Sequence, residues 1–126
     1  MTAQLPRLLL AAILVVSTAC GAKTNVVEYS VSAQTNYEKG RKELERQDWI
    51  AATSYFSFVA SRFPWSKYAL LAELGLADVQ FRAGHYLDAL AAYRQFMKLH
   101  PYYDSIENGS VSFRAGEAYG RSSSEH

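Results

Sequence analysis

The sequence is poor in the residues that build catalytic and metal centres. Its 126 residues include one cysteine and three histidines, and no HxxxH or HExxH spacing occurs. Because a zinc site needs several such ligands at close spacing, we predict no metal site. GxSxG and glycine-rich phosphate loops are absent, and the carboxylates Glu73 and Asp78 lie five residues apart, where we expect them to be solvated. These absences predict a protein that is not an enzyme and uses no cofactor.

An excess of one charge is absent as well. The 13 basic and 12 acidic residues give a formal net charge of +1, which offers no electrostatic footprint for nucleic acid. The local run EKGRKELER at 38–46 is interpreted as a solvated helix face with i,i+4 pairs such as Glu38–Lys42. The uncharged stretch from Leu8 to Ala19 is too short to span a bilayer, which needs about 20 helical residues.

What the chain does contain is a repeat. The stretch AATSYFSFVASRFP at 51–64 returns 37 residues later as DALAAYRQFMKLHP at 88–101. The equivalent positions are Gly40 and Ala77, Ala52 and Ala89, Phe56 and Tyr93, and Pro64 and Pro101. A small residue, an alanine, an aromatic residue and a proline at this spacing are typical of a tetratricopeptide repeat (TPR), a helix–turn–helix unit of about 34 residues.

Apolar residues at helical spacing predict five helices, roughly at 33–46, 48–62, 67–83, 86–100 and 109–121. Asp48 is an expected N-cap and Gly84 an expected left-handed stop. The second helix should bury Trp49 and Phe56 against the first helices of both repeats. The predicted fold is therefore all-α, a TPR-like helix–turn–helix solenoid over 32–121. It has two full repeats and the first helix of a third, with a disordered tail at 122–126.

In the fifth predicted helix, Gly116 and Tyr119 match the small and aromatic positions of a first TPR helix. That helix is the start of the third repeat.

The beginning of the chain is a different kind of segment. Residues 1–19 combine one basic residue with an apolar run, as in a secretory signal peptide. The segment ends in STAC followed by glycine, which resembles the lipobox of bacterial lipoproteins, so we predict lipidation at Cys20. A cysteine without an intramolecular disulfide partner favours this interpretation. Ser17 stands where the consensus has leucine, and the alternative is an ordinary signal peptide with a chance cysteine.

Residues 20–31 are polar and small and are predicted to form a flexible tether between the lipid and the repeats. Within them, the apolar pair Val26–Val27 could instead pack on the first helix.

Three stretches resemble the BamD/ComL family of outer-membrane protein assembly lipoproteins. They are RFPWSKYA at 62–69, LAELGLADVQFRAGHYLDALAAYRQFMKLHP at 71–101 and FRAGEAYG at 113–120. The RFPxSxYA link and the LHP ending are not part of the general TPR consensus. The resemblance covers roughly 32–121. The stretch YYDSIENG at 102–109 departs from the sequence pattern of the family. Members of the family have five repeats.

The resemblance implies a non-catalytic, lipid-anchored scaffold on the periplasmic face of the cell outer membrane. Its implied partners are outer-membrane β-barrel assembly subunits and unfolded barrel proteins, with no small-molecule substrate. In such proteins the N-terminal repeats are thought to receive the barrel substrates. One alternative is a periplasmic TPR adaptor of a cell-envelope or cell-division machine, similar to TolA-binding proteins, which usually begin with a coiled coil. Another is a degraded remnant without activity.

First helices of TPR units line the concave face of the superhelix. Counting from Ala33 and Leu70, the inward positions give the candidate peptide-binding residues Tyr37, Arg41, Asp78, Phe81 and Arg82. Leu74 falls on the same face and is interpreted as core. An unfolded barrel protein ends in an aromatic residue with a free carboxylate. Rings supply stacking area and the planar fork of arginine suits a carboxylate, so this set matches such an end.

Overall fold

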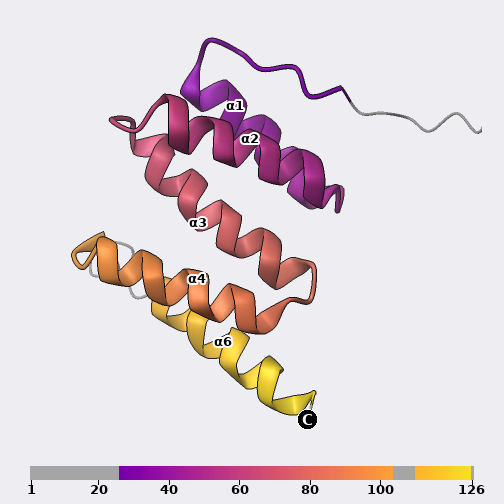
Figure 1. The fold of residues 1–126 in the computed structure, drawn as a ribbon, viewed down its shortest axis with the longest axis vertical. Coiled ribbons are helices and arrows are strands. Elements are labelled where there is room, and N and C mark those ends of the chain that lie inside the picture. The colour runs from indigo at the N-terminus through magenta and orange to yellow at the C-terminus, as the bar shows by residue number, and fades with distance from the viewer. Residues whose placement is uncertain (1–25, 104–109, 126) are drawn as a thin grey trace, which may run out of the picture.

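A computed structural model describes residues 26–103 and 110–125, and every regular element in those two ranges is a helix (Figure 1). The helices are α1 (Ala33–Glu45), α2 (Trp49–Arg62), α3 (Lys67–Arg82), α4 (Tyr86–Leu99) and α6 (Ser110–Ser124). The first four agree with the predicted ranges to within one residue at either end. The all-α, TPR-like fold class is confirmed.

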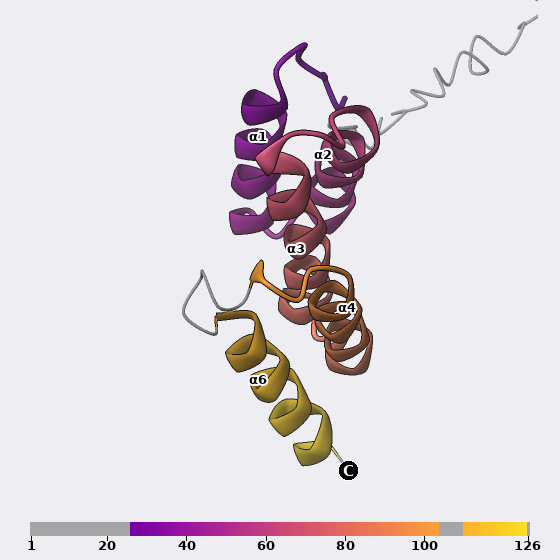
Figure 2. The same cartoon turned by 90° about the vertical axis from the view of Figure 1, so that its left-hand side faces the viewer.

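The helices stack in chain order. Each helix packs against the next, and α1 also contacts α3. In Figure 2, α1 and α6 lie to the left of the stack, α2 and α4 lie to the right, and α3 lies between them. The first helices of successive repeats, α1, α3 and α6, contribute side chains to one groove, as in a TPR solenoid.

Local side chains set where the helices begin. Ser32, Asp48 and Ser66 are the N-caps of α1, α2 and α3, and each side chain accepts a backbone N–H of the first turn. Such caps satisfy donors that have no partner inside the helix. The predicted cap at Asp48 is therefore present.

Left-handed residues set where the first helix of each repeat ends. Gly84 has a φ of 85°, as expected for a helix stop without a Cβ. The equivalent residue of the first repeat is Gln47, with a φ of 63°. A side chain in this conformation costs roughly 1–2 kcal/mol. The turn is thus the same in both repeats, although only the second carries the favourable residue.

Phe56 is the centre of the first core. Its side chain is fully buried, and its ring lies between Gly40 of α1 and Gly75 of α3. A Cβ at either glycine would approach the ring to 2.8 or 2.9 Å. Trp49 packs against the same cluster but keeps part of its surface exposed. Phe56 therefore joins both repeats, as the sequence predicts.

A second core surrounds Tyr93, between α3, α4 and α6. Tyr93 is 1% exposed and belongs to one cluster with Leu74, Ala89 and Val111. It takes the place in the second repeat that Phe56 has in the first. The interpretation of Leu74 as core is confirmed.

The end of α6 differs from the predicted tail. The helix continues to Ser124, so the tail predicted at 122–126 is wrong for residues 122–124. Ser122 is buried, in helical spacing with Val111, Ala115 and Ala118, and its hydroxyl donates to a carbonyl one turn earlier. Because each of the three serines satisfies its hydroxyl within the helix, a polar sequence can extend α6.

The residues of α6 that pack closely against its neighbour also differ from the predicted ones. Gly116 and Tyr119 are exposed, and a Cβ at Gly116 would meet nothing within 4 Å. Ala115 and Ala118 supply the close packing instead.

The tether predicted at 20–31 ends earlier than expected. The carbonyl of Glu28 accepts from Lys39 Nζ at 2.8 Å and from the Tyr55 hydroxyl at 3.3 Å. The buried amide of Asn36 bonds both the N–H and the carbonyl of Ser30 at 2.7 Å. Residues 28–31 are thus fixed to α1 and α2. The predicted signal peptide and Cys20 lie outside the described residues. None of the described helices has the length and hydropathy needed to cross a membrane.

Candidate functional site

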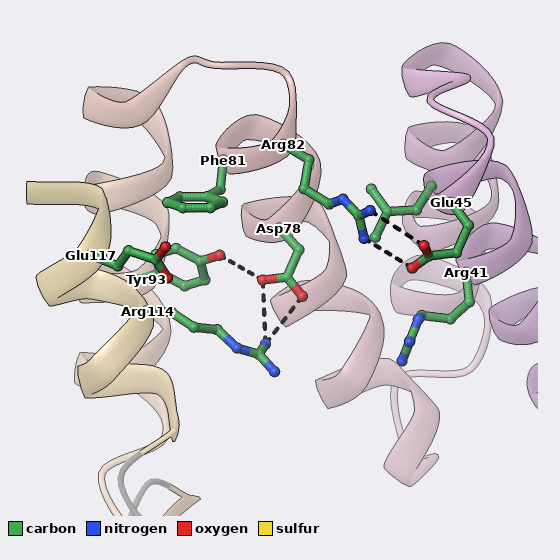
Figure 3. A pocket seen from close by; sticks show the side chains of 9 residues that line it. Arg41, Glu45, Asp78, Phe81, Arg82, Tyr93, Arg114 and Glu117 are labelled. Carbon is green, nitrogen blue, oxygen red and sulfur yellow. Dashed lines mark hydrogen bonds and ion pairs between the residues drawn. The ribbon is translucent and has the colours of Figure 1, made fainter. Parts of the chain in front are cut away.

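A groove of about 390 Å³ runs along the face that the first helices share (Figure 3). It is lined by Arg41, Leu44, Glu45, Asp78, Phe81, Arg82, Tyr93, Arg114 and Glu117. Four of the five predicted site residues, all except Tyr37, lie there together. Tyr37 lines an adjoining hollow that shares Arg41, Asp78 and Arg114 with the groove. The predicted residues therefore form one continuous surface.

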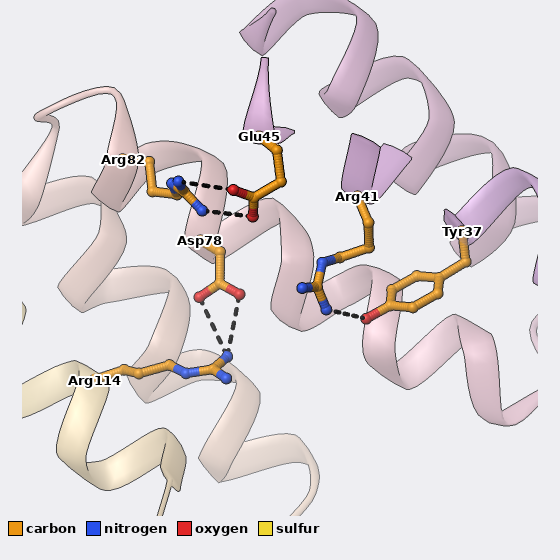
Figure 4. Close-up of polar contacts among 6 residues, drawn as sticks. All are labelled: Tyr37, Arg41, Glu45, Asp78, Arg82 and Arg114. Atoms are coloured by element: carbon orange, nitrogen blue, oxygen red, sulfur yellow. Dashed lines mark hydrogen bonds and ion pairs between the residues drawn. The ribbon is translucent and has the colours of Figure 1, made fainter. Parts of the chain in front are cut away.

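Two ion pairs cross the groove between neighbouring first helices (Figure 4). Arg82 of α3 binds both carboxylate oxygens of Glu45 in α1, at 2.9 and 3.3 Å. Arg114 of α6 binds both oxygens of Asp78 in α3, at 3.1 and 3.3 Å. Both pairs are partly exposed, so each adds little to stability. They hold the guanidinium groups of Arg82 and Arg114 in place.

Asp78 has a second partner besides Arg114. Its Oδ1 also accepts from the hydroxyl of Tyr93 at 2.5 Å. Burial raises the pKa of Asp78, while the Tyr93 hydrogen bond and the Arg114 charge oppose that rise. Burial and the nearby Asp78 charge raise the pKa of Tyr93, so this tyrosine stays protonated and donates.

The expectation that Asp78 is solvated is therefore wrong. Glu73, expected to be solvated too, binds His100 Nε2 at 2.8 Å. Tyr93 and His100 reach these carboxylates because α4 packs against α3.

We expect Tyr93→Phe to lower the free energy of unfolding by about 1.5–3 kcal/mol, the range for a hydrogen bond to a charged group. The ring and its packing are kept, so the loss reports the bond to Asp78. Chemical denaturation measures it, with Tyr119→Phe as the control because that ring is 59% exposed. Equal midpoints for the two variants would mean that the bond to Asp78 contributes nothing.

Arg41 differs from the other groove arginines. Its Nη1 donates to the hydroxyl of Tyr37, one turn earlier on α1, at 3.4 Å. This hydrogen bond raises its pKa, against the effect of burial. Within 26–103 and 110–125, no carboxylate forms an ion pair with it. Figure 4 shows its guanidinium between Tyr37 and Asp78.

Phe81 forms the aromatic end of the groove. Its ring meets Tyr86 edge-on, with centroids 5.4 Å apart. The guanidinium of Arg121 lies 5.5 Å from the Phe81 centroid and 5.8 Å from that of Tyr86. The ring is thus fixed by its neighbours, and it is only partly buried. It offers a preformed apolar surface about one helical turn from Asp78.

Sequence reasoning missed five groove residues, namely Leu44, Glu45, Tyr93, Arg114 and Glu117. A signal for the ion pairs was present. Glu45 and Arg82 are 37 residues apart and Asp78 and Arg114 are 36 apart, close to the repeat length. Opposite charges at equivalent positions of neighbouring first helices predict such pairs. In the described parts of the chain, no three His, Cys, Asp or Glu side chains gather as metal ligands would.

The chain is similar to known proteins over most of its length. Residues 30–110 match the model of the YfiO family, described as outer membrane lipoprotein. The outer membrane protein assembly factor BamD of Neisseria gonorrhoeae is 26% identical over 93 residues, covering 70% of this chain and 35% of that protein. BamD proteins from two Neisseria meningitidis strains match to the same extent. The chain thus spans about a third of the length of these relatives. No solved structure matches it.

Proposed function

Because this chain belongs to the YfiO family of outer membrane lipoproteins, we propose that it acts in outer-membrane protein assembly as a non-catalytic scaffold. The BamD relatives are named as assembly factors. In this proposal a lipid on Cys20 holds the chain at the periplasmic face of the outer membrane. Its partners are assembly subunits and unfolded barrel proteins, which bind to the repeats.

The observation that carries the binding role is the charge balance of the groove. Among the described residues the groove has three carboxylates, and each has an arginine: Glu45 has Arg82, Asp78 has Arg114, and Glu117 has Arg121. Of the described groove arginines, Arg41 is the one outside these ion pairs. A ligand carboxylate can therefore bind Arg41 without displacing an existing ion pair. It would gain a charge-assisted, two-pronged hydrogen bond.

The surroundings of Arg41 favour a carboxylate next to an aromatic ring. Tyr37 lies beside the guanidinium, and Phe81 is a fixed ring farther along the groove. Arg82 and Arg114 are already paired with carboxylates, so Arg41 is the groove arginine to which one carboxylate of a ligand would bind. A single terminal carboxylate following an aromatic residue meets both requirements. Unfolded barrel proteins carry such an end.

The test is a titration with a peptide that ends in phenylalanine with a free carboxylate. We expect Arg41→Ala to weaken binding by about 10- to 100-fold, which corresponds to the loss of a hydrogen bond to a charged group. Arg94→Ala is the matched control, because Arg94 is exposed on α4 outside the groove. We expect Arg82→Ala to have a smaller effect than Arg41→Ala.

A C-terminally amidated peptide completes the test. It should bind wild type as weakly as the free acid binds Arg41→Ala, and it should bind both proteins equally. If amidation weakens binding to Arg41→Ala as much as it weakens binding to wild type, then Arg41 is not the carboxylate site. The same conclusion follows if neither amidation nor Arg41→Ala weakens binding.

A further inference from the structure

An exposed apolar patch lies at the end of the molecule opposite α6. We call it the Trp65 patch; it consists of Val31, Phe63, Pro64 and Trp65, around a shallow hollow of about 570 Å³. Val31 is 97% exposed and Trp65 is 81% exposed. An exposed tryptophan beside an exposed valine is costly in water, and contiguous apolar surface of this kind marks an interaction site.

The patch is held in shape by a chain of rings. Tyr29 stacks on Phe58 with centroids 4.1 Å apart, Phe58 meets Phe63 at 6.0 Å, and Phe63 meets Trp65 at 6.2 Å. A backbone bond of 2.9 Å from Ser66 to Phe63 closes the turn that carries the tryptophan. The ring contacts and the turn therefore hold Trp65 in a fixed position with its side chain exposed to solvent.

The described charged residues at the patch are basic. Arg62 lines the hollow and Lys67 follows the turn, and both are exposed. Among the residues that the structure describes, none of those lining the hollow is a carboxylate. Tryptophan at the rim of an apolar surface with flanking arginine and lysine is the composition of proteins that rest in the headgroup region of a bilayer.

The position of the patch connects it to the predicted anchor. Figures 1 and 2 show the segment before α1 and the α2–α3 connection at the same end of the stack. Ser30 and Val31 line the hollow together with 63–65. Val26 lies six positions after Cys20, a reach of about 20 Å in an extended chain. A lipid on Cys20 therefore keeps this end of the molecule near the bilayer.

We propose that the Trp65 patch lies on the phospholipid surface, with the Trp65 ring in the headgroup region and Arg62 and Lys67 near lipid phosphates. The proposal rests on the lipid anchor of the proposed function. It gives the scaffold a defined orientation, in which the α2–α3 connection faces the membrane and α6 points away from it. A lipid alone would leave the domain free to rotate on its attachment.

The experiment uses the full-length, membrane-extracted protein in phospholipid vesicles. The chain has two tryptophans, so Trp49→Phe leaves Trp65 as the only reporter and Trp65→Phe leaves Trp49. We expect Trp65 emission to shift to the blue and to lose at least half its intensity when the vesicles contain brominated phospholipid. Trp49, packed against the first core at a distance from the patch, should be quenched several-fold less.

Further variants distinguish membrane contact by the Trp65 patch from attachment through the lipid. Full-length Cys20→Ser, added to vesicles containing anionic lipid, should still show Trp65 quenching at high lipid concentration, and Arg62→Ala with Lys67→Ala should reduce it. If Cys20 carries no lipid but this quenching occurs, the anchor fails and the patch stands. Unquenched Trp65 in protein that is anchored to the vesicles overturns the proposal and leaves the patch to a protein partner.

Discussion

Phe56→Ala is expected to lower the free energy of unfolding by about 3–5 kcal/mol, the usual cost of removing a buried aromatic ring. Small domains are stable by only about 5–15 kcal/mol, so the variant should be close to unfolding at growth temperature. The effect should be at the upper end of the range. The ring is fully buried between Gly40 and Gly75, and neither glycine has a side chain that could move into the cavity.

The matched control for this prediction is Phe113→Ala. Phe113 is 71% exposed on α6, so its removal should change the free energy of unfolding by less than about 0.5 kcal/mol. Chemical denaturation at equilibrium measures both variants. A loss of similar size for the two phenylalanines would mean that Phe56 does not join the repeats.

The glycines on either side of Phe56 give an independent check. Gly40→Ala should destabilise the protein, because the added Cβ would lie 2.8 Å from the ring. In the Phe56→Ala background the same change should cost much less, since the ring is gone and alanine favours a helix by about 0.5–1 kcal/mol over glycine. A double-mutant cycle measures the coupling. Additive effects would contradict direct contact between the ring and the glycine.

The second large effect is expected at Cys20. If its sulfur carries the lipid, Cys20→Ser should move the whole protein from the membrane fraction to the soluble fraction, or leave it as the unprocessed precursor. Stable anchoring needs two acyl chains, which diacylation at one cysteine supplies. Fractionation and the mass of the mature protein measure the change.

Ser17→Leu is the control for the anchoring prediction. It restores the leucine of the lipobox consensus, so processing should be equal to or faster than that of the wild type. A wild-type protein that is soluble in the periplasm, with a thiol at Cys20 that reacts with maleimide, would contradict lipidation.

The sequence alone was sufficient for the helices of both full repeats. The beginnings of α1, α2 and α3 depend on Ser32, Asp48 and Ser66, whose side chains bond the adjacent backbone, and the end of α3 depends on the left-handed Gly84. These interactions span only a few residues. The 37-residue period likewise identified Phe56 and Tyr93 as the two core rings, because a repeat places equivalent residues in equivalent surroundings.

Counting TPR positions also gave the groove face, with Arg41, Asp78, Phe81 and Arg82 on one surface. It could not show which arginine is available to a ligand. That depends on the ion pairs Arg82–Glu45 and Arg114–Asp78, which join helices that are far apart in sequence. A side chain's position in the repeat predicts the direction in which it points, but not the group it meets there.

Tertiary structure alone decided the remaining features. Gln47 takes the left-handed turn that Gly84 takes in the next repeat, because packing of α1 against α2 outweighs the local cost. Ser122 is buried and Gly116 exposed, because the face of α6 that meets α4 is fixed by the core around Tyr93 and not by the glycine pattern. Local sequence determined where the helices form, since caps and periodicity act over one or two turns. Contacts between helices determined burial and charge pairing, since those energies exist only after distant segments have packed together.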